Sequence, residues 1–267
     1  MKKFELTSEF VTFLGKKLFR IKALISFGNV EEGELGGYVE KEENLSNDGN
    51  AWVSGDARVY GDARVYSNAW VSGNAWVSGN AWVSGNAWVS GDARVYGDAR
   101  VSGDARVSGD ARVYGDARVS GNARVYGNAR VYGDARVSGN ARVYGDAWVS
   151  GNARVSGDAR VSGDAMVSGD ARVSGDASVS GDAMVHGDAR VSGDADYATV
   201  QGFGSEYRTT TFFRTKAGDI GVRCGCFYGT LDDFRKKVKE THGDSKTAKE
   251  YLMVADLMEF RFSKEEA

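Results

Sequence analysis

The chain has 267 residues, enough for one large or two small domains. Apolar residues make up 42% of it, which supports a folded core, and its net charge of -3 argues against a dedicated nucleic-acid binder, whose domains are normally strongly basic. The absence of proline excludes collagen-like and polyproline structures. No signal peptide, no apolar run long enough for a membrane span and no disulfide framework is indicated, so we expect a cytoplasmic protein.

Residues 1–48 are not repetitive, and we expect them to form an amino-terminal β cap. The stretches "FRIKAL" and "GGYVEKEENLS" are expected to cover the first unit of the repeat that follows. A cap is required because a bare end of a β stack exposes unpaired strand edges. The segment also carries four phenylalanines that should fold back along the first repeats and partly bury a tryptophan there: Phe4, Phe10, Phe13 and Phe19.

Residues 49–196 repeat the pattern G-[DN]-A-x-V-[SY] every six residues without insertion. Within A-x-V-[SY] the side chains alternate as in a strand, so Ala and Val point to one side and the other two positions to the opposite side. Gly with Asn or Asp then supplies a corner, because these residues tolerate positive φ or accept local hydrogen bonds. Each hexad cannot bury its Ala and Val alone, so the hexads must stack on one another.

This pattern resembles the hexapeptide repeat of left-handed parallel β-helices, in which three hexads make one triangular coil. The fold class that the resemblance implies is mainly β, a single-stranded left-handed parallel β-helix. The segment "IKALISFGNVEEGELGGYVEKEENLSNDGNAWV" further resembles uncharacterised bacterial and phage repeat proteins of the YdcK type. The resemblance also makes a homotrimer one possible assembly.

The 18-residue coil sorts the outward x positions onto three faces. The first face should carry a tryptophan ladder followed by arginines, and the second and third faces should each carry a tryptophan among arginines. These tryptophans should point outward, where they either stiffen the rod by stacking or bind a partner. The candidate binding residues are Trp52, Trp70, Trp76, Trp82 and Trp88.

The 15 arginines and 17 aspartates of the repeat recur as D-A-R, which suggests that Asp and Arg compensate each other in a surface lattice. A surface built for phosphate would leave the arginine charge uncompensated. Nucleic-acid binding is therefore not favoured, and we expect a protein partner or a homo-oligomer, with no membrane association.

Residues 197–267 should form a ββαα module. "EYRTTTFFRTKAGDIGVRCGCFYG" reads as a hairpin that turns at "KAGD". Thr230 and Asp233 look like a capping box opening a helix that Gly243 closes, and "TAKEYLMVADLMEFRF" reads as a second amphipathic helix.

Few side chains suit catalysis. Weak candidates are His186, in an outward slot of the repeat, and His242 and Cys224 in the carboxy-terminal module. Three-His zinc is impossible with two histidines, and the pair Cys224 and Cys226 with His242 falls short of four zinc ligands. We expect no metal and no cofactor.

The sequence therefore predicts a non-enzymatic structural or binding rod of bacterial or phage origin. Recognition of a partner is assigned to the carboxy-terminal module or to the tryptophans. The alternative is a hexapeptide-type acyltransferase that uses acyl-CoA, since the resemblance includes such enzymes.

Overall fold

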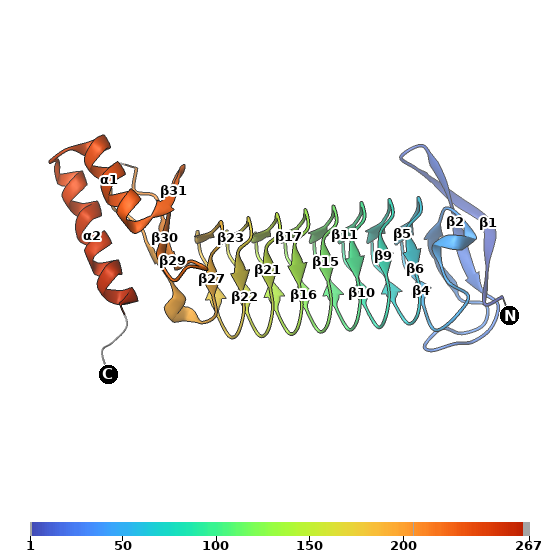
Figure 1. The fold of residues 1–267 in the computed structure, drawn as a ribbon. Helices are drawn as coiled ribbons and strands as arrows, with labels where there is room; N and C mark the ends of the chain where they lie inside the picture. The colour runs from blue at the N-terminus through green and yellow to red at the C-terminus, as the bar shows by residue number, and fades with distance from the viewer. Residues whose placement is uncertain (1, 205, 264–267) are drawn as a thin grey trace.

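The computed structural model describes residues 2–204 and 206–263. They form a straight rod of stacked coils, with a β structure at its amino-terminal end and a sheet with two helices at its carboxy-terminal end (Figure 1). Strands three hexads apart pair in parallel, for example Trp52 with Trp70 and Trp70 with Trp88. The predicted mainly β fold with three hexads to a coil is thus confirmed, and eight coils complete the rod.

Each coil contributes one two-residue strand to each of three faces. The first face contains β4 (Trp52–Val53), β7 (Trp70–Val71), β10 (Trp88–Val89), β13 (Arg106–Val107), β16 (Arg124–Val125), β19 (Arg142–Val143), β22 (Arg160–Val161) and β25 (Ser178–Val179). The second contains β5 (Arg58–Val59), β8 (Trp76–Val77), β11 (Arg94–Val95), β14 (Arg112–Val113), β17 (Arg130–Val131), β20 (Trp148–Val149), β23 (Met166–Val167) and β26 (Met184–Val185). The third contains β6 (Arg64–Val65), β9 (Trp82–Val83), β12 (Arg100–Val101), β15 (Arg118–Val119), β18 (Arg136–Val137), β21 (Arg154–Val155), β24 (Arg172–Val173) and β27 (Arg190–Val191).

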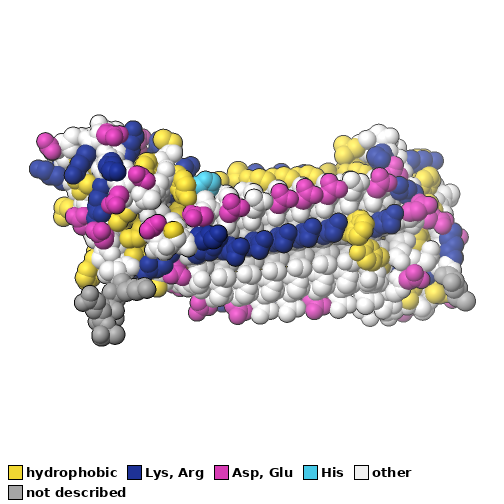
Figure 2. Space-filling model, in the orientation of Figure 1, with side chains coloured by type: hydrophobic (Ala, Val, Ile, Leu, Met, Phe, Trp, Pro, Cys, Tyr) yellow, Lys and Arg dark blue, Asp and Glu magenta, His cyan; other side chains and the backbone are white. Residues whose placement is uncertain are grey.

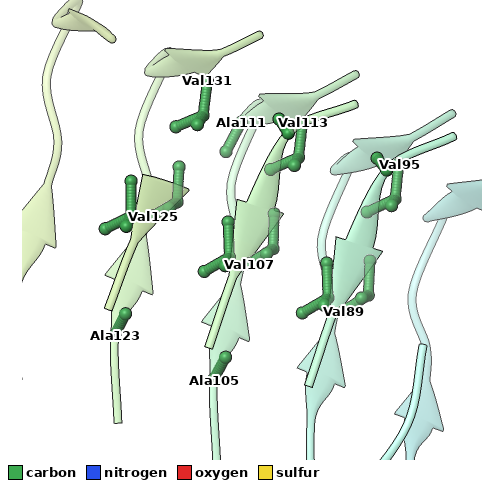
Figure 3. Close-up of a cluster of buried hydrophobic side chains, with 14 of the residues drawn as sticks. Val89, Val95, Ala105, Val107, Ala111, Val113, Ala123, Val125 and Val131 are labelled. Atoms are coloured by element: carbon green, nitrogen blue, oxygen red, sulfur yellow. The ribbon is translucent and has the colours of Figure 1, made fainter. Parts of the chain in front are cut away.

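The interior of the rod is built from Ala and Val alone. The Ala and Val of every complete hexad, from Ala51 to Val191, are wholly buried, and valines of successive coils lie in rows, as Val89, Val107 and Val125 show in Figure 3. Because these side chains are small and identical from coil to coil, each coil packs on the next without change of shape. The inward positions inferred from the alternation are therefore confirmed.

The corners explain why glycine recurs. The glycines between successive strands have positive φ, a conformation that side chains with a Cβ rarely adopt. They also stack: a Cβ added at Gly121 would lie 3.0 Å from the backbone nitrogen of Gly139 in the next coil. The one substitution, Ser67, keeps the same conformation with a φ of 63°.

The amino-terminal segment extends the second face of the rod. A hairpin of β1 (Phe4–Phe13) and β2 (Lys16–Ala23) pairs with β3 (Leu35–Val39), and β3 pairs in parallel with β5. Leu45, after a 3₁₀ turn at Glu42–Asn44, bridges Val65 on the third face. Residues of this segment belong to the same core cluster as the rod, including Phe4, Ile21, Val39 and Leu45.

The carboxy-terminal module follows a 3₁₀ turn at Asp194–Asp196. It contains a four-stranded antiparallel sheet of β28 (Tyr197–Val200), β29 (Thr210–Arg214), β30 (Ile220–Cys224) and β31 (Phe227–Thr230), then α1 (Leu231–His242) and α2 (Lys246–Phe262). The hairpin, the Thr230–Asp233 capping box and the Gly243 terminus are confirmed. The expected ββαα order was incomplete, because β28 and β31 are only four residues long and carry little alternation.

Within the described residues, neither helix combines the length and apolarity that crossing a membrane requires.

Candidate functional site

The candidate tryptophans become more exposed with distance from the amino-terminal end of the rod. Trp52 is wholly buried, beneath the ring of Phe27, 5.5 Å away between centroids, and the backbone of Gly36. A Cβ at Gly36 would lie 2.7 Å from the Trp52 ring, so glycine is what allows this close passage. Trp52 occupies the outward slot of its hexad, but the amino-terminal segment covers it, so its ring is not exposed to a partner in this structure.

The next two tryptophans are half-buried. Trp70 donates a hydrogen bond from Nε1 to the hydroxyl of Ser54 at 3.0 Å, and Trp76 packs against Phe13 with ring centroids 4.5 Å apart. The expected folding back of the amino-terminal phenylalanines over the tryptophans is confirmed at Phe13, and Phe27 adds a contact that was not predicted. These contacts assign Trp52, Trp70 and Trp76 largely to packing of the rod end.

Trp82 and Trp88 remain accessible, with 38% and 50% of their surface exposed. Each is met by an arginine of the following coil: Arg100 lies 5.1 Å from the Trp82 ring and Arg106 5.9 Å from the Trp88 ring. Among the described residues no ring contact joins Trp52, Trp70 and Trp88, although their strands pair in register. The predicted ladder is therefore a ladder of backbone positions without stacked rings, and of its three members Trp88 has an arginine of the next coil over its ring.

A cavity of about 640 Å³ adjoins Trp82 where the amino-terminal segment meets the third face. Tyr66 stands nearly perpendicular to Trp82, with centroids 6.1 Å apart, and Leu45 and Val65 provide apolar lining. Glu42, Glu43 and Arg64 also line the cavity, and Glu42 is paired with Lys2. An aromatic pair beside carboxylates is suited to a cationic side chain. The sequence predicted Trp82 but not Tyr66 or the two glutamates, because only the fold brings them together.

The third face carries two parallel rows of opposite charge. Six consecutive coils place an arginine in the outward slot, and the corner before each carries an acid in five of these coils. Figure 2 shows the basic row running along the rod beside the acidic row. A groove of about 500 Å³ lies along them, lined by Arg136, Arg154, Arg172 and Asp134 among others. The rows comprise Arg100, Arg118, Arg136, Arg154, Arg172 and Arg190, and Asp98, Asp116, Asp134, Asp170 and Asp188.

The expected lattice of Asp–Arg ion pairs is not present. Within residues 2–204 and 206–263, no ion pair joins an arginine of the repeat to an aspartate of the repeat. The corner residues instead bond along the stack, as when the Asn152 amide donates to Asp170 at 3.1 Å. The two rows therefore run side by side without ion pairs between them among the described residues, and they stay available to an outside group.

The candidate catalytic residues occupy separate places. His186 lies at the carboxy-terminal end of the second face, 2.8 Å from the Ser168 hydroxyl through Nδ1 and edge-on to Tyr228. Burial, with a smaller contribution from Arg223, lowers the pKa of His186. The ring is thus held at the junction between rod and module, by packing against Tyr228 and by its hydrogen bond with Ser168.

Cys224 and His242 line one small cavity of about 280 Å³ in the carboxy-terminal module, together with Cys226, Phe234 and Tyr251. The Thr210 hydroxyl lies 3.1 Å from the Cys224 sulfur, and burial followed by the neighbouring Cys224 raises the pKa of Tyr251 to about 12. Both cysteines are free thiols. Among the described residues no three His, Cys, Asp or Glu side chains cluster in a way that could hold a metal ion.

Two protein families match parts of this chain. Residues 57–73, 69–85, 75–91 and 87–103 match the family described as YdcK beta solenoid repeat. Residues 98–202 match the bactofilin family, described as polymer-forming cytoskeletal. No curated protein matches the chain at a significant level. The resemblance to YdcK-type repeat proteins is thereby confirmed, and the bactofilin match was not foreseen.

The bactofilin match covers the part of the rod that carries both charged rows of the third face. The amino-terminal segment and the two helices lie outside both matches. The sequence could have revealed the charged rows, because writing the repeat in lines of three hexads aligns them. Because D-A-R was interpreted as Asp and Arg neutralising each other, two solvent-exposed rows of opposite charge were not predicted from the sequence.

Proposed function

We propose that this protein is a non-enzymatic structural rod of bacterial or phage origin that assembles with further copies of itself in the cytoplasm. The observation that carries the proposal is the continuous rod of eight coils, whose residues 98–202 match a family described as polymer-forming cytoskeletal. Its Ala and Val core leaves no interior space for a substrate. The free thiols of Cys224 and Cys226 are compatible with a reducing compartment.

Assembly by stacking bare coils end to end is disfavoured in this chain. Both ends of the rod carry added structure: β3 pairs with β5 at one end, and β29 packs against β26 and β27 at the other. Capping of this kind prevents edge-to-edge pairing in β proteins. The sides of the rod therefore offer the available surface for contacts between copies.

Analytical ultracentrifugation of the full chain over a range of concentrations tests the proposal. We expect mass to increase with concentration and electron microscopy to show rods associated in bundles or filaments. A single monomeric species at every concentration and at low salt would overturn it.

A second partner surface is proposed at the Trp82 cavity, where a basic segment of a partner protein would place a cationic side chain against the rings of Tyr66 and Trp82. The carboxylate of Glu43 supports this choice of partner, whereas Glu42 already pairs with Lys2. Titration of the full chain with an arginine-rich peptide, followed by tryptophan fluorescence, tests it against the Trp82→Arg variant. Equal binding by both proteins would contradict the proposal.

A further inference from the structure

The third face combines two features that the other faces lack together. Its arginines from Arg100 to Arg172 are exposed and lie in one unbroken row, about 4.8 Å apart from coil to coil. The acidic row runs parallel to it at a lateral separation of about 6–7 Å, the distance between alternate residues of a strand. The face is therefore a stripe of positive charge beside a stripe of negative charge.

The third face is also flat. Its second outward position is serine in every coil after the first: Ser84, Ser102, Ser120, Ser138, Ser156, Ser174 and Ser192. On the second face the same position holds the stacked rings of Tyr96, Tyr114 and Tyr132, which half-bury the neighbouring arginines. On the first face it holds Tyr126 and Tyr144. Small side chains along one face allow a second rod to approach closely.

We propose that two copies of this chain pair side by side and parallel through the third face, related by a two-fold axis that runs along the rods. The proposal rests on the proposed function, because it names the surface through which copies associate. A half-turn about an axis parallel to the rod exchanges the two stripes. The arginine row of each copy then faces the aspartate row of the other.

The opposite orientation is disfavoured by the same geometry. A two-fold axis across the rods keeps each stripe on its own side, so that the arginine row of one copy faces the arginine row of its partner. Like charges at contact distance repel, and shifting the rods sideways to avoid this leaves half of each stripe unpaired. The charged rows therefore select the parallel pair.

The register follows from the shared coil spacing. Both copies repeat at the same interval, so all the charges of one copy align with those of the other at the same time. Sliding one rod along the other by one coil leaves the charges of one terminal coil of each copy without a partner. A linear polyanion would satisfy the arginine row alone and would be repelled by the aspartate row beside it. A second copy satisfies both rows.

Charge reversal tests the pairing in the full chain. The acidic variant carries Arg118→Glu, Arg136→Glu and Arg154→Glu, and the basic variant carries Asp116→Lys, Asp134→Lys and Asp170→Lys. Each variant alone presents mostly one sign of charge on its third face, so we expect it to lose assembly at low salt. An equal mixture of the acidic and basic variants should assemble again. The matched control, Arg106→Glu, Arg124→Glu and Arg142→Glu on the first face, makes the same change in net charge and should assemble as the parent does.

The outcomes separate the two proposals. If the parent assembles and the acidic variant assembles equally, lateral pairing through the third face is wrong, while the proposed function stands. If the first-face control loses assembly as completely as the acidic variant, the effect is one of net charge and the pairing is again wrong. A monomeric parent overturns the proposed function itself. Should the acidic variant melt early, replacing the same arginines with serine, which occupies this slot at Ser178, provides the test in a milder form.

Orientation is measured separately with spin labels at Ser102→Cys or Ser174→Cys in a chain with Cys224→Ser and Cys226→Ser. The two-fold axis lies between the charged rows, so in a parallel pair the serine rows lie on opposite edges of the contact and no sample, single-labelled or mixed, should give a short distance. In an antiparallel pair the serine rows of the two copies face each other with their ends reversed, so a mixture of the two labels gives a short distance. A short distance in the mixture would overturn the parallel arrangement.

Discussion

The two ends of the rod both leave strand edges without a neighbouring coil, and they cap them with different groups. Along each strand the backbone groups of successive residues point alternately to the two ends, so each end leaves both N–H and C=O groups to be capped. At the first coil the side chains of Lys3 and Asn44 donate to exposed carbonyls, and the Glu40 carboxylate accepts from the Gly61 N–H. At the last coil Asp194, Asp196 and Thr211 accept from exposed N–H groups, and the Tyr197 hydroxyl donates to the Ser178 carbonyl.

The two caps also differ in how they pack on the rod. The amino-terminal segment shares the core of the rod and adds strands to its second face, whereas the carboxy-terminal module has a core of its own formed by its sheet and two helices. Of the module's core residues, only Phe213 belongs to the rod cluster. One cap is thus a continuation of the solenoid, and the other is a separate unit attached to its end.

Removing each cap in turn tests this difference, and we expect the largest effects here. Deletion of residues 1–48 exposes Trp52 and the first coil, so we expect insoluble aggregates in expression trials. Deletion of residues 197–267 leaves the rod core intact, so we expect a folded rod with a raised tendency to associate. A soluble, monomeric protein from the first deletion would contradict the shared core.

Residues 197–267 alone provide the complementary test. With a separate core, this fragment should unfold cooperatively in a circular dichroism melt, and residues 1–48 alone should not. A fragment 197–267 without a melting transition would show that the module depends on the rod. The domain boundaries at residues 48 and 196 remain a proposal that these experiments address.

Substituting tryptophans of the first face by arginine should measure how far the amino-terminal cap reaches. Trp52→Arg loses a wholly buried ring, so we expect about 3–5 kcal/mol of destabilisation, and Trp70→Arg about 1–3 kcal/mol. Trp88→Arg, which places the commonest residue of the repeat in an exposed slot, should change stability by less than about 0.5 kcal/mol. Thermal melts of the three variants measure how the loss of stability changes along the first face. Equal losses of stability would mean that the amino-terminal cap buries none of the three tryptophans selectively.

The repeat made the fold predictable, since Ala and Val at alternate positions define an inside and Gly at the corners admits positive φ. The depth of Trp52 was not predictable, because residues 1–48 contain no repeat that would place Phe27 or Gly36 above it. The charges of the repeat were seen, but their arrangement was misread: only the stacking direction shows that Arg136 is followed by Arg154 rather than neutralised by Asp134. The candidate catalytic residues were dispersed by the fold, apart from Cys224 and His242, which share a cavity that their separation in sequence does not suggest.

The side chains that cap the strand edges by hydrogen bonds should contribute less to the free energy of unfolding than the buried aromatic rings. Asn44 and Thr211 should also differ in how much they contribute. Asn44 is buried and donates to the carbonyls of Gly61 and Ala63 at 3.0 and 2.8 Å, so Asn44→Leu leaves two acceptors unpaired. Thr211 is buried and accepts from one N–H, that of Met184 at 2.9 Å. At about 1–3 kcal/mol for each unsatisfied group, Asn44→Leu should destabilise more than Thr211→Val. Chemical denaturation measures both, with the exposed Thr199→Val as the control; equal values for Thr211→Val and Thr199→Val would contradict the capping role.

The smallest expected effect is a dependence of stability on pH, which should fall in different pH ranges for the two ends of the rod. Burial lowers the pKa of Lys3 to about 8 and also lowers the pKa of His186, where Arg223 adds to the effect. In both cases the unfolded chain binds the proton more strongly than the folded one, so stability falls as pH drops. For His186 the loss should begin near the ordinary histidine pKa of about 6.5, whereas for Lys3 it should occur between about pH 10.5 and 8. Thermal melts of His186→Ser and of the parent between pH 8 and pH 5 measure the contribution of His186 separately from that of Lys3. The variant, which keeps the serine usual in this slot, should lose less of its melting temperature than the parent, and parallel curves would show that His186 titrates alike in the folded and unfolded chains.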